Sequence, residues 1–171
     1  MPPTVQKRPA PIAWIHQGVL DLIKNEASSK LPDETGGILM GYWSIPYTEV
    51  VITNATGPGP LAEHSPSFYK PDNKWQHEEA IRIYEEFEIE YLGDWHSHPY
   101  TSDYLSWDDR KTLRTISRHK KSRVLFPLML ILHDKDEWML TAWKFSPTKW
   151  TRFLPVEHIT AMEIRIASED Y

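Results

Sequence analysis

The sequence predicts a single-domain α/β fold, and three observations support this prediction. The chain of 171 residues suits a single domain, since domains commonly run to about 100–200 residues. Hydrophobic residues make up 40% of the chain, which allows a sizeable buried core. Helical and strand-like patterns alternate along the sequence, which is typical of the α/β class.

The chain is expected to divide into three parts. Residues 1–11 are rich in proline and are expected to form a flexible arm, residues 12–158 the folded domain, and residues 159–171 a C-terminal extension. No apolar stretch reaches the roughly 18 residues of a membrane span, and the arm lacks the apolar core of a signal peptide. We therefore expect a soluble cytoplasmic protein that does not bind membranes.

The first half of the domain predicts a helix, a hairpin and a loop. The helix is expected to stop near Pro32, and the apolar runs 36–43 and 49–55 predict two strands of a hairpin. Residues 57–67 mix prolines and glycines and are expected to be a loop without regular structure. The apolar face of the first helix is expected to carry Ile15, Val19, Leu22 and Ile23.

The second half alternates again between helices and strands. Residues 72–90 and 106–117 predict helices, whereas residues 91–98, 125–133 and 138–145 predict strands. The buried face of the helix over 72–90 is expected to carry Trp75, Ala80, Tyr84 and Phe87.

Charge and cysteine content exclude several classes of protein. The formal net charge is −5, which argues against nucleic acid as a partner because phosphate binding relies on a basic face. The absence of cysteine excludes disulfides, thiolate nucleophiles and cysteine-rich zinc ribbons. Any bound metal must therefore be held by nitrogen and oxygen atoms.

The residues from His96 to Asp109 could form a metal site. Residues two apart in a strand point to the same face, so His96 and His98 can present two imidazoles side by side. A carboxylate is an acceptable third ligand beside two imidazoles, and Asp109 can supply it. Asp108 is the rival ligand, but one helical position is about 100° of rotation, so only one of the two should face the metal.

Neighbouring polar residues allow both structural and chemical interpretations. Ser106 and Asp109 have the spacing of a helix capping box, a role that is compatible with metal binding because a cap fixes the first helical turn. Asp94 shares strand parity with His96, so it could orient the imidazole, although an exposed carboxylate at the strand start is the preferred interpretation. Glu34 is the candidate proton acceptor for a metal-activated water.

These residues together resemble the JAMM motif of the JAB/MPN zinc metalloproteases. The motif appears as Glu34 in a Glu-Thr-x-Gly-Ile-Leu-x-Gly segment, then His96-x-His98-Pro99, then Ser106-x-x-Asp109. The likeness extends from about residue 31 to residue 143 and implies a mixed sheet flanked by helices, similar to the cytidine-deaminase architecture. It also implies that His96, His98 and Asp109 ligate one Zn²⁺, that Glu34 acts as general acid–base, and that Ser106 stabilises the oxyanion.

Three further segments, which are less specific than the motif, resemble a particular branch of this family. Residues 57–60, 68–72 and 93–96 are similar to stand-alone prokaryotic JAB deconjugases of antiphage operons, either CBASS or bacterial ubiquitin-like systems. The resemblance implies an isopeptidase or peptidase that cleaves after the C-terminus of a ubiquitin-like protein or its conjugate. Operon-encoded activating and conjugating enzymes, and the conjugated target, are the other implied partners.

The substrate tail is expected to bind near the histidines. A flexible tail binds most simply by adding a strand to an exposed sheet edge, and residues 57–67 and 99–105 are the candidate walls. Tyr100 and Tyr104 are the candidate contacts with substrate. Core packing is the preferred interpretation of Trp95 and Trp107, and no metal role is assigned to His64, His77, His119 or His133.

Three other functions fit parts of the pattern. Processing of a sulfur-carrier precursor uses the same chemistry, and sequence alone does not separate it from deconjugation. A non-catalytic MPN scaffold would be favoured by a missing ligand, but all five motif positions are present. A zinc deaminase is excluded, because its Pro-Cys-x-x-Cys signature needs cysteine.

Overall fold

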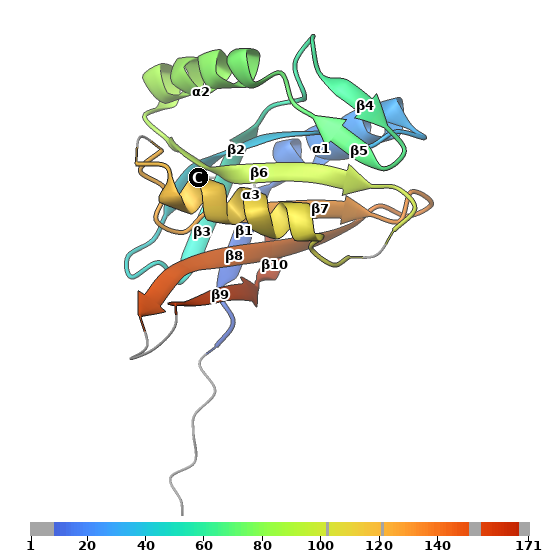
Figure 1. Ribbon diagram of the computed structural model, residues 1–171. Helices are drawn as coiled ribbons and strands as arrows, with labels where there is room; N and C mark the ends of the chain where they lie inside the picture. The colour runs from blue at the N-terminus through green and yellow to red at the C-terminus, as the bar shows by residue number, and fades with distance from the viewer. Residues whose placement is uncertain (1–8, 102, 121, 151–154, 168–171) are drawn as a thin grey trace, which may run out of the picture.

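The computed structural model describes residues 9–101, 103–120, 122–150 and 155–167, in which helices and strands alternate as an α/β fold (Figure 1). No helix within these ranges is long and apolar enough to cross a membrane. In chain order the elements are β1 (Ile12–His16), α1 (Gln17–Lys30), β2 (Gly36–Trp43), β3 (Glu49–Ala55), β4 (Glu63–Ser65), β5 (Phe68–Lys70), α2 (Asn73–Phe87), β6 (Glu90–His98), α3 (Trp107–Arg118), β7 (Leu128–His133), β8 (Met139–Trp150), β9 (Pro155–Ala161) and β10 (Glu163–Ala167).

Most strands belong to one mixed sheet, in the order β10-β1-β3-β2-β6-β7-β8-β9, while β4 and β5 form a small separate sheet. β1 lies parallel to both β3 and β10, and β6 lies parallel to β7. The predicted hairpin of β2 and β3 is confirmed by their antiparallel pairing. The single-domain mixed sheet flanked by helices is the predicted fold class.

The two edge strands of the sheet, β9 and β10, are consecutive in the chain. β9 pairs with β8, and after Met162 the chain continues as β10, which pairs with β1. The expected boundary at residue 158 falls within β9, and residues 163–167 of the expected extension lie in the main sheet. Residues 1–8 of the expected arm lie outside the described residues.

Helices cover both faces of the sheet (Figure 1). Side chains alternate between faces along a strand, so each strand contributes to two apolar clusters. In β2, Ile38 and Met40 pack in the cluster of Ile83 from α2, whereas Leu39 packs in the cluster of Ile23 from α1. The same alternation in β7 divides its residues between α1 and α3. One face therefore carries α1, and the other carries α2 and α3.

The expected start of the first helix is wrong. Residues 12–16 form β1, and the helix begins only at Gln17. Ala13 and Ile15 are both fully buried, and a spacing of two between buried residues is typical of a strand. The helical spacing of buried residues begins only at Val19. Leu22, expected on the apolar face, is 41% exposed.

The buried face of α2 also differs from the expected one. Tyr84 and Phe87 are about half exposed, at 56% and 50%, while Gln76 and Ile83 are buried. Gln76 and Ile83 are seven residues apart, which is two helical turns, so they lie on one side of the helix. A pattern search that counts only apolar residues misses a face that includes a buried glutamine.

Two smaller expectations are also corrected. The expected loop over residues 57–67 contains β4, because residues 63–65 find a partner in β5, the strand that immediately follows. Trp107, expected in the core, is 70% exposed, because it is the first residue of α3 and points away from the sheet-facing Leu113. Trp95 is buried as expected.

Close packing between strands requires glycine at position 37. A Cβ atom on Gly37 would lie 1.9 Å from the carbonyl oxygen of Thr56 and 2.7 Å from Nε1 of Trp95. These two atoms form a hydrogen bond of 2.9 Å across the glycine. The absence of a side chain therefore lets the buried indole reach its acceptor.

We expect Gly37→Ala to lower the free energy of unfolding by about 1–3 kcal/mol, because the added methyl group overlaps backbone atoms. Gly57→Ala is the matched control, since its Cβ would approach no atom closer than 3.9 Å. Urea denaturation of both variants measures the difference. Equal stabilities for the two variants would contradict the packing described at residue 37.

Candidate metal centre

The last residues of β6 place two imidazoles side by side. His96 and His98 point to the same face of the strand, and their Nε2 atoms are 2.8 Å apart. The two side chains are buried, with exposed fractions of 9% and 8%. This face of the sheet is the one that carries α2 and α3, so the first turn of α3 can reach the pair.

Asp109 adds a carboxylate to the two imidazoles. Its Oδ1 lies 3.2 Å from Nε2 of His96, and its Oδ2 accepts a hydrogen bond of 2.6 Å from the backbone amide of Ser106. The Ser106 hydroxyl in turn accepts from the Asp109 amide, so the predicted capping box is confirmed. Capping therefore fixes the carboxylate on the side that faces His96.

Electrostatics keep Asp109 ionised. Burial alone would raise the pKa of its carboxyl, but the hydrogen bond and charge of His96 and the bonds from Ser106 hold the pKa well below its ordinary value. Hydrogen bonds and a nearby opposite charge both favour the ionised form of a buried carboxylate. Asp108, the rival ligand, is exposed to solvent.

The three side chains fit a divalent metal ion. One ligand atom from each of His96, His98 and Asp109 lies within 4.8 Å of the others. Two imidazole nitrogens and one carboxylate oxygen are a donor set that zinc accepts, with a further position left for water. In the described part of the chain, no other group of histidine, aspartate and glutamate side chains converges in this way.

Glu34 lies beside this cluster, just before β2. Burial raises the pKa of its carboxyl to about 7, while the charge of His96 opposes this shift and the charge of Asp109 adds to it. A carboxyl with a pKa near neutrality can both accept and release a proton. The structure thus brings the candidate proton acceptor and the candidate ligands into one site.

A buried polar pair, which the sequence did not indicate, joins the two halves of the site. Ser97 donates its amide to the carbonyl of Thr35 at 2.8 Å, and its hydroxyl accepts from the Thr35 amide at 3.0 Å. Both residues are fully buried. The alternation of side chains along a strand could have indicated it: His96 and His98 point to one face of the sheet, so Ser97 between them points to the opposite face.

Asp94 is not the exposed carboxylate that the sequence favoured. Its Oδ1 accepts a hydrogen bond of 2.6 Å from the Tyr91 hydroxyl. Burial raises its pKa to about 6, and the Tyr91 bond and the charge of His96 lower it. Asp94 therefore lies on the same strand as the histidines, close enough to His96 for the charge of His96 to lower its pKa.

Exposed aromatic side chains lie close in the chain to the candidate ligands. Tyr100 and Tyr104, the candidate substrate contacts, are 56% and 67% exposed. Lys135 lies 5.6 Å from the ring centre of Tyr100, and Lys111 lies 5.3 Å from that of Trp107. These rings present a surface on which a bound chain could pack.

A groove of about 850 Å³ lies between α2 and α3 and has Asp94 and Tyr91 in its lining. Ala80, Ile81 and Tyr84 line it from α2, and Lys111 and Thr115 line it from α3. Ile81 and Tyr84 are 45% and 56% exposed, so this helix face offers apolar surface to a partner. The groove reaches the strand that carries the two histidines.

Comparison with known proteins identifies the family. Residues 16–146 match the family described as prokaryotic homologs of the JAB domain. The chain is 37% identical over 136 residues to "Probable metalloprotease y4qB" of Sinorhizobium fredii (strain NBRC 101917 / NGR234), an alignment that covers 77% of this chain and 82% of that protein. The chain therefore belongs to the prokaryotic JAB family, and a metalloprotease-like function is supported.

A solved structure agrees with the fold. The solution structure of protein DSY2949 from Desulfitobacterium hafniense superimposes with a TM-score of 0.66 and covers 92% of this chain and 94% of its own. The sequence identity is 17%, so this similarity concerns the fold alone.

Two neighbouring aspartates allow the ligand assignment to be tested. We expect Asp109→Asn to weaken binding of Zn²⁺ or Co²⁺ at least about tenfold, because a charged ligand becomes neutral while the amide oxygen can still cap α3. Asp108→Asn is the matched control and should bind like the wild type. Calorimetric titration with each metal measures both variants, and equal affinities would exclude Asp109 as a ligand.

Proposed function

We propose that this protein is a zinc-dependent peptidase or isopeptidase that cleaves after the C-terminus of a ubiquitin-like protein. The observation that carries the proposal is the convergence of Glu34 with His96, His98 and Asp109 at the end of β6. Membership of the prokaryotic JAB family and the metalloprotease name of a relative support it.

Three residues would hold the zinc ion: His96 and His98, whose Nε2 atoms face each other, and Asp109, whose Oδ1 faces His96. Zinc bound there would supply a Lewis acid that lowers the pKa of water toward neutrality. The three donors are buried and held by strand, cap and helix, so little reorganisation is needed on binding.

Glu34 would move the proton. Its carboxylate takes up a proton from the attacking water and later delivers it to the amine that leaves, which is general acid–base catalysis. In the metal-free site burial raises the pKa of this carboxyl to about 7, and a bound Zn²⁺ would lower it, so the carboxylate would be the form that accepts the proton.

Ser106 would stabilise the developing negative charge. Its hydroxyl oxygen accepts from the Asp109 amide, and its proton, which interacts with the Asp109 carboxylate, would turn to the substrate oxygen. Donation to the carbonyl oxygen that becomes tetrahedral favours the transition state over the ground state. Capping and catalysis then use different parts of the same hydroxyl.

The surface beside the centre suits a folded modifier with an extended tail. The groove between α2 and α3 offers apolar side chains to a folded body, and it reaches the strand of the ligands. In the described residues β5 pairs with β4 alone, so its outer edge can accept one more strand. Tyr100 and Tyr104 are the proposed contacts with the part of the substrate that follows the scissile bond.

The proposed setting is a bacterial conjugation system of the antiphage type. Genes for a ubiquitin-like protein and for activating and conjugating enzymes beside this gene would support deconjugation. A sulfur-carrier gene as the only such neighbour would instead favour precursor processing. Purified protein offered each candidate fused to a C-terminal extension distinguishes the two by which fusion is cleaved.

We expect Glu34→Gln to lower the rate of cleavage by about 10²–10⁴-fold, because the proton acceptor is lost. Metal analysis of the same variant should still give about one zinc per chain. Glu163→Gln, at an exposed carboxylate on β10, is the control and should cleave normally. Full activity of Glu34→Gln, or no metal in the wild-type protein, would refute the mechanism.

The dual role of Ser106 predicts a separation of stability from activity. Glycine caps helices nearly as well as serine, so Ser106→Gly should lose only a few tenths of a kcal/mol of stability. The same variant should lose about 10²–10³-fold in kcat, since it has no hydroxyl to donate. Thermal unfolding and cleavage kinetics on one preparation test this, and unchanged kcat would restrict Ser106 to capping.

A further inference from the structure

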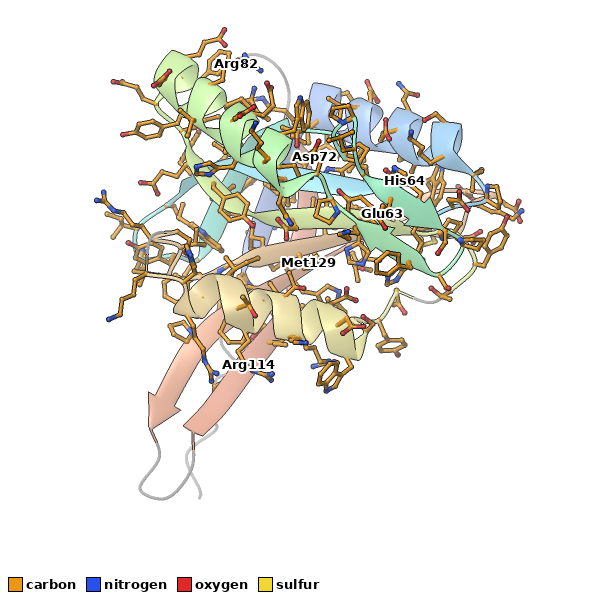
Figure 2. The ribbon with its side chains drawn as sticks, turned by 45° about the horizontal axis from the view of Figure 1, so that its top comes forward. Glu63, His64, Asp72, Arg82, Arg114 and Met129 are labelled. Carbon is orange, nitrogen blue, oxygen red and sulfur yellow. The ribbon has the colours of Figure 1, made fainter. Side chains whose placement is uncertain are left out.

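The backbone of Glu34 is held from both sides by β4. The Glu34 amide donates to the carbonyl of Ser65 at 2.9 Å, and the Glu34 carbonyl accepts from Nδ1 of His64 at 2.8 Å. Figure 2 shows His64 on the β4–β5 hairpin. Both polar groups of the Glu34 backbone are therefore bonded to a hairpin that lies outside the main sheet.

The His64 ring is itself held in place. It stacks on Tyr69 of β5, with ring centres 5.7 Å apart and an angle of 29°. The Tyr69 hydroxyl accepts a hydrogen bond of 3.1 Å from Gln76, a buried residue of α2. A chain of contacts thus runs from α2 through Tyr69 and His64 to the Glu34 carbonyl.

Tyr69 also packs against the segment that follows Glu34. A Cβ atom on Gly36 would lie 2.7 Å from Cε1 of Tyr69 and 2.9 Å from Cβ of His96. The glycine therefore lets the tyrosine ring and the metal-site histidine approach the same backbone. Residues on both sides of Thr35 contact the hairpin.

We propose that His64 is a positioning residue for Glu34, a role that rests on the proposed function of Glu34 as proton carrier. The imidazole fixes the carbonyl, and Ser65 fixes the amide, so the remaining freedom of Glu34 lies in its side-chain torsions. A misplacement of about 1 Å can cost 10²-fold in rate, so control of this backbone controls catalysis. His64 acts without touching metal or substrate.

A role confined to folding of the hairpin is the alternative. Within the hairpin the His64 ring stacks on Tyr69, whereas the backbone pairing of β4 with β5 and the contact between Lys70 and Glu63 do not need the His64 side chain. The hydrogen bond of the imidazole leaves the hairpin and ends on Glu34. The two roles therefore predict that removal of the ring loosens different backbone: the Glu34 backbone if His64 positions it, or the hairpin backbone if His64 only supports folding.

Three full-length variants separate the roles. His64→Ala removes the donor, and His64→Asn restores an N–H two bonds from Cβ, as Nδ1 is. His158→Ala, at an exposed histidine on β9, is the matched control. Amide hydrogen exchange reports on the Glu34 amide directly, since this amide donates to Ser65, and amides of the β4–β5 pairing serve as the internal reference.

Positioning predicts that His64→Ala accelerates exchange of the Glu34 amide about tenfold, while hairpin amides, zinc content and the His158→Ala control stay unchanged. Cleavage of a ubiquitin-like fusion should lose roughly 10- to 100-fold in kcat, with KM within about twofold. His64→Asn should recover both the slow exchange and most of kcat.

Several results would overturn the proposal. Unchanged exchange at Glu34 in His64→Ala, an equal acceleration throughout the hairpin, or no recovery in His64→Asn each leaves His64 without a positioning role. Unchanged kcat despite faster exchange would also refute it. If the wild-type protein cleaves no fusion, the proposed function fails instead. Exchange of the Glu34 amide, and its recovery in His64→Asn, then still decides whether His64 positions Glu34.

Discussion

The reciprocal pairing of Thr35 with Ser97 is the interaction on which the site depends. These residues lie 62 positions apart in the chain, and their three hydrogen bonds join the residue before β2 to the end of β6. Both are fully buried, so breaking the pair would leave polar groups without water to replace their partners. Glu34 precedes Thr35, and the two histidines flank Ser97, so a structural pairing sets the distance between the proposed proton carrier and the proposed ligands.

The third proposed ligand is placed by a different kind of constraint. Asp109 uses Oδ2 to cap α3 and presents Oδ1 to His96. A carboxylate whose two oxygens have separate tasks has little freedom to rotate, which favours a preformed ligand set. Strand parity, buried pairing and helix capping, each a common folding device, therefore combine into a centre that no one of them would create.

Much of the site could be predicted from sequence because its residues obey local rules. His96 and His98 follow the period of a strand, and Ser106 and Asp109 follow the spacing of a cap, so geometry could be inferred from intervals. His64 could not be found, because its bond to Glu34 depends on how the hairpin lies against the start of β2. The exposed Tyr84 was misplaced for a related reason: the sheet-facing side of α2 includes a polar residue, Gln76.

The pairing of β1 with β10 has a consequence for how the protein is made. β1 leaves the ribosome early and can pair with β3 soon afterwards, but its other edge finds β10 only when residues 163–167 have been synthesised. An unpaired strand edge is a template for association with other chains. The nascent domain therefore carries an exposed edge through most of its translation, and binding of β1 by a chaperone during synthesis would protect it until the final strand arrives.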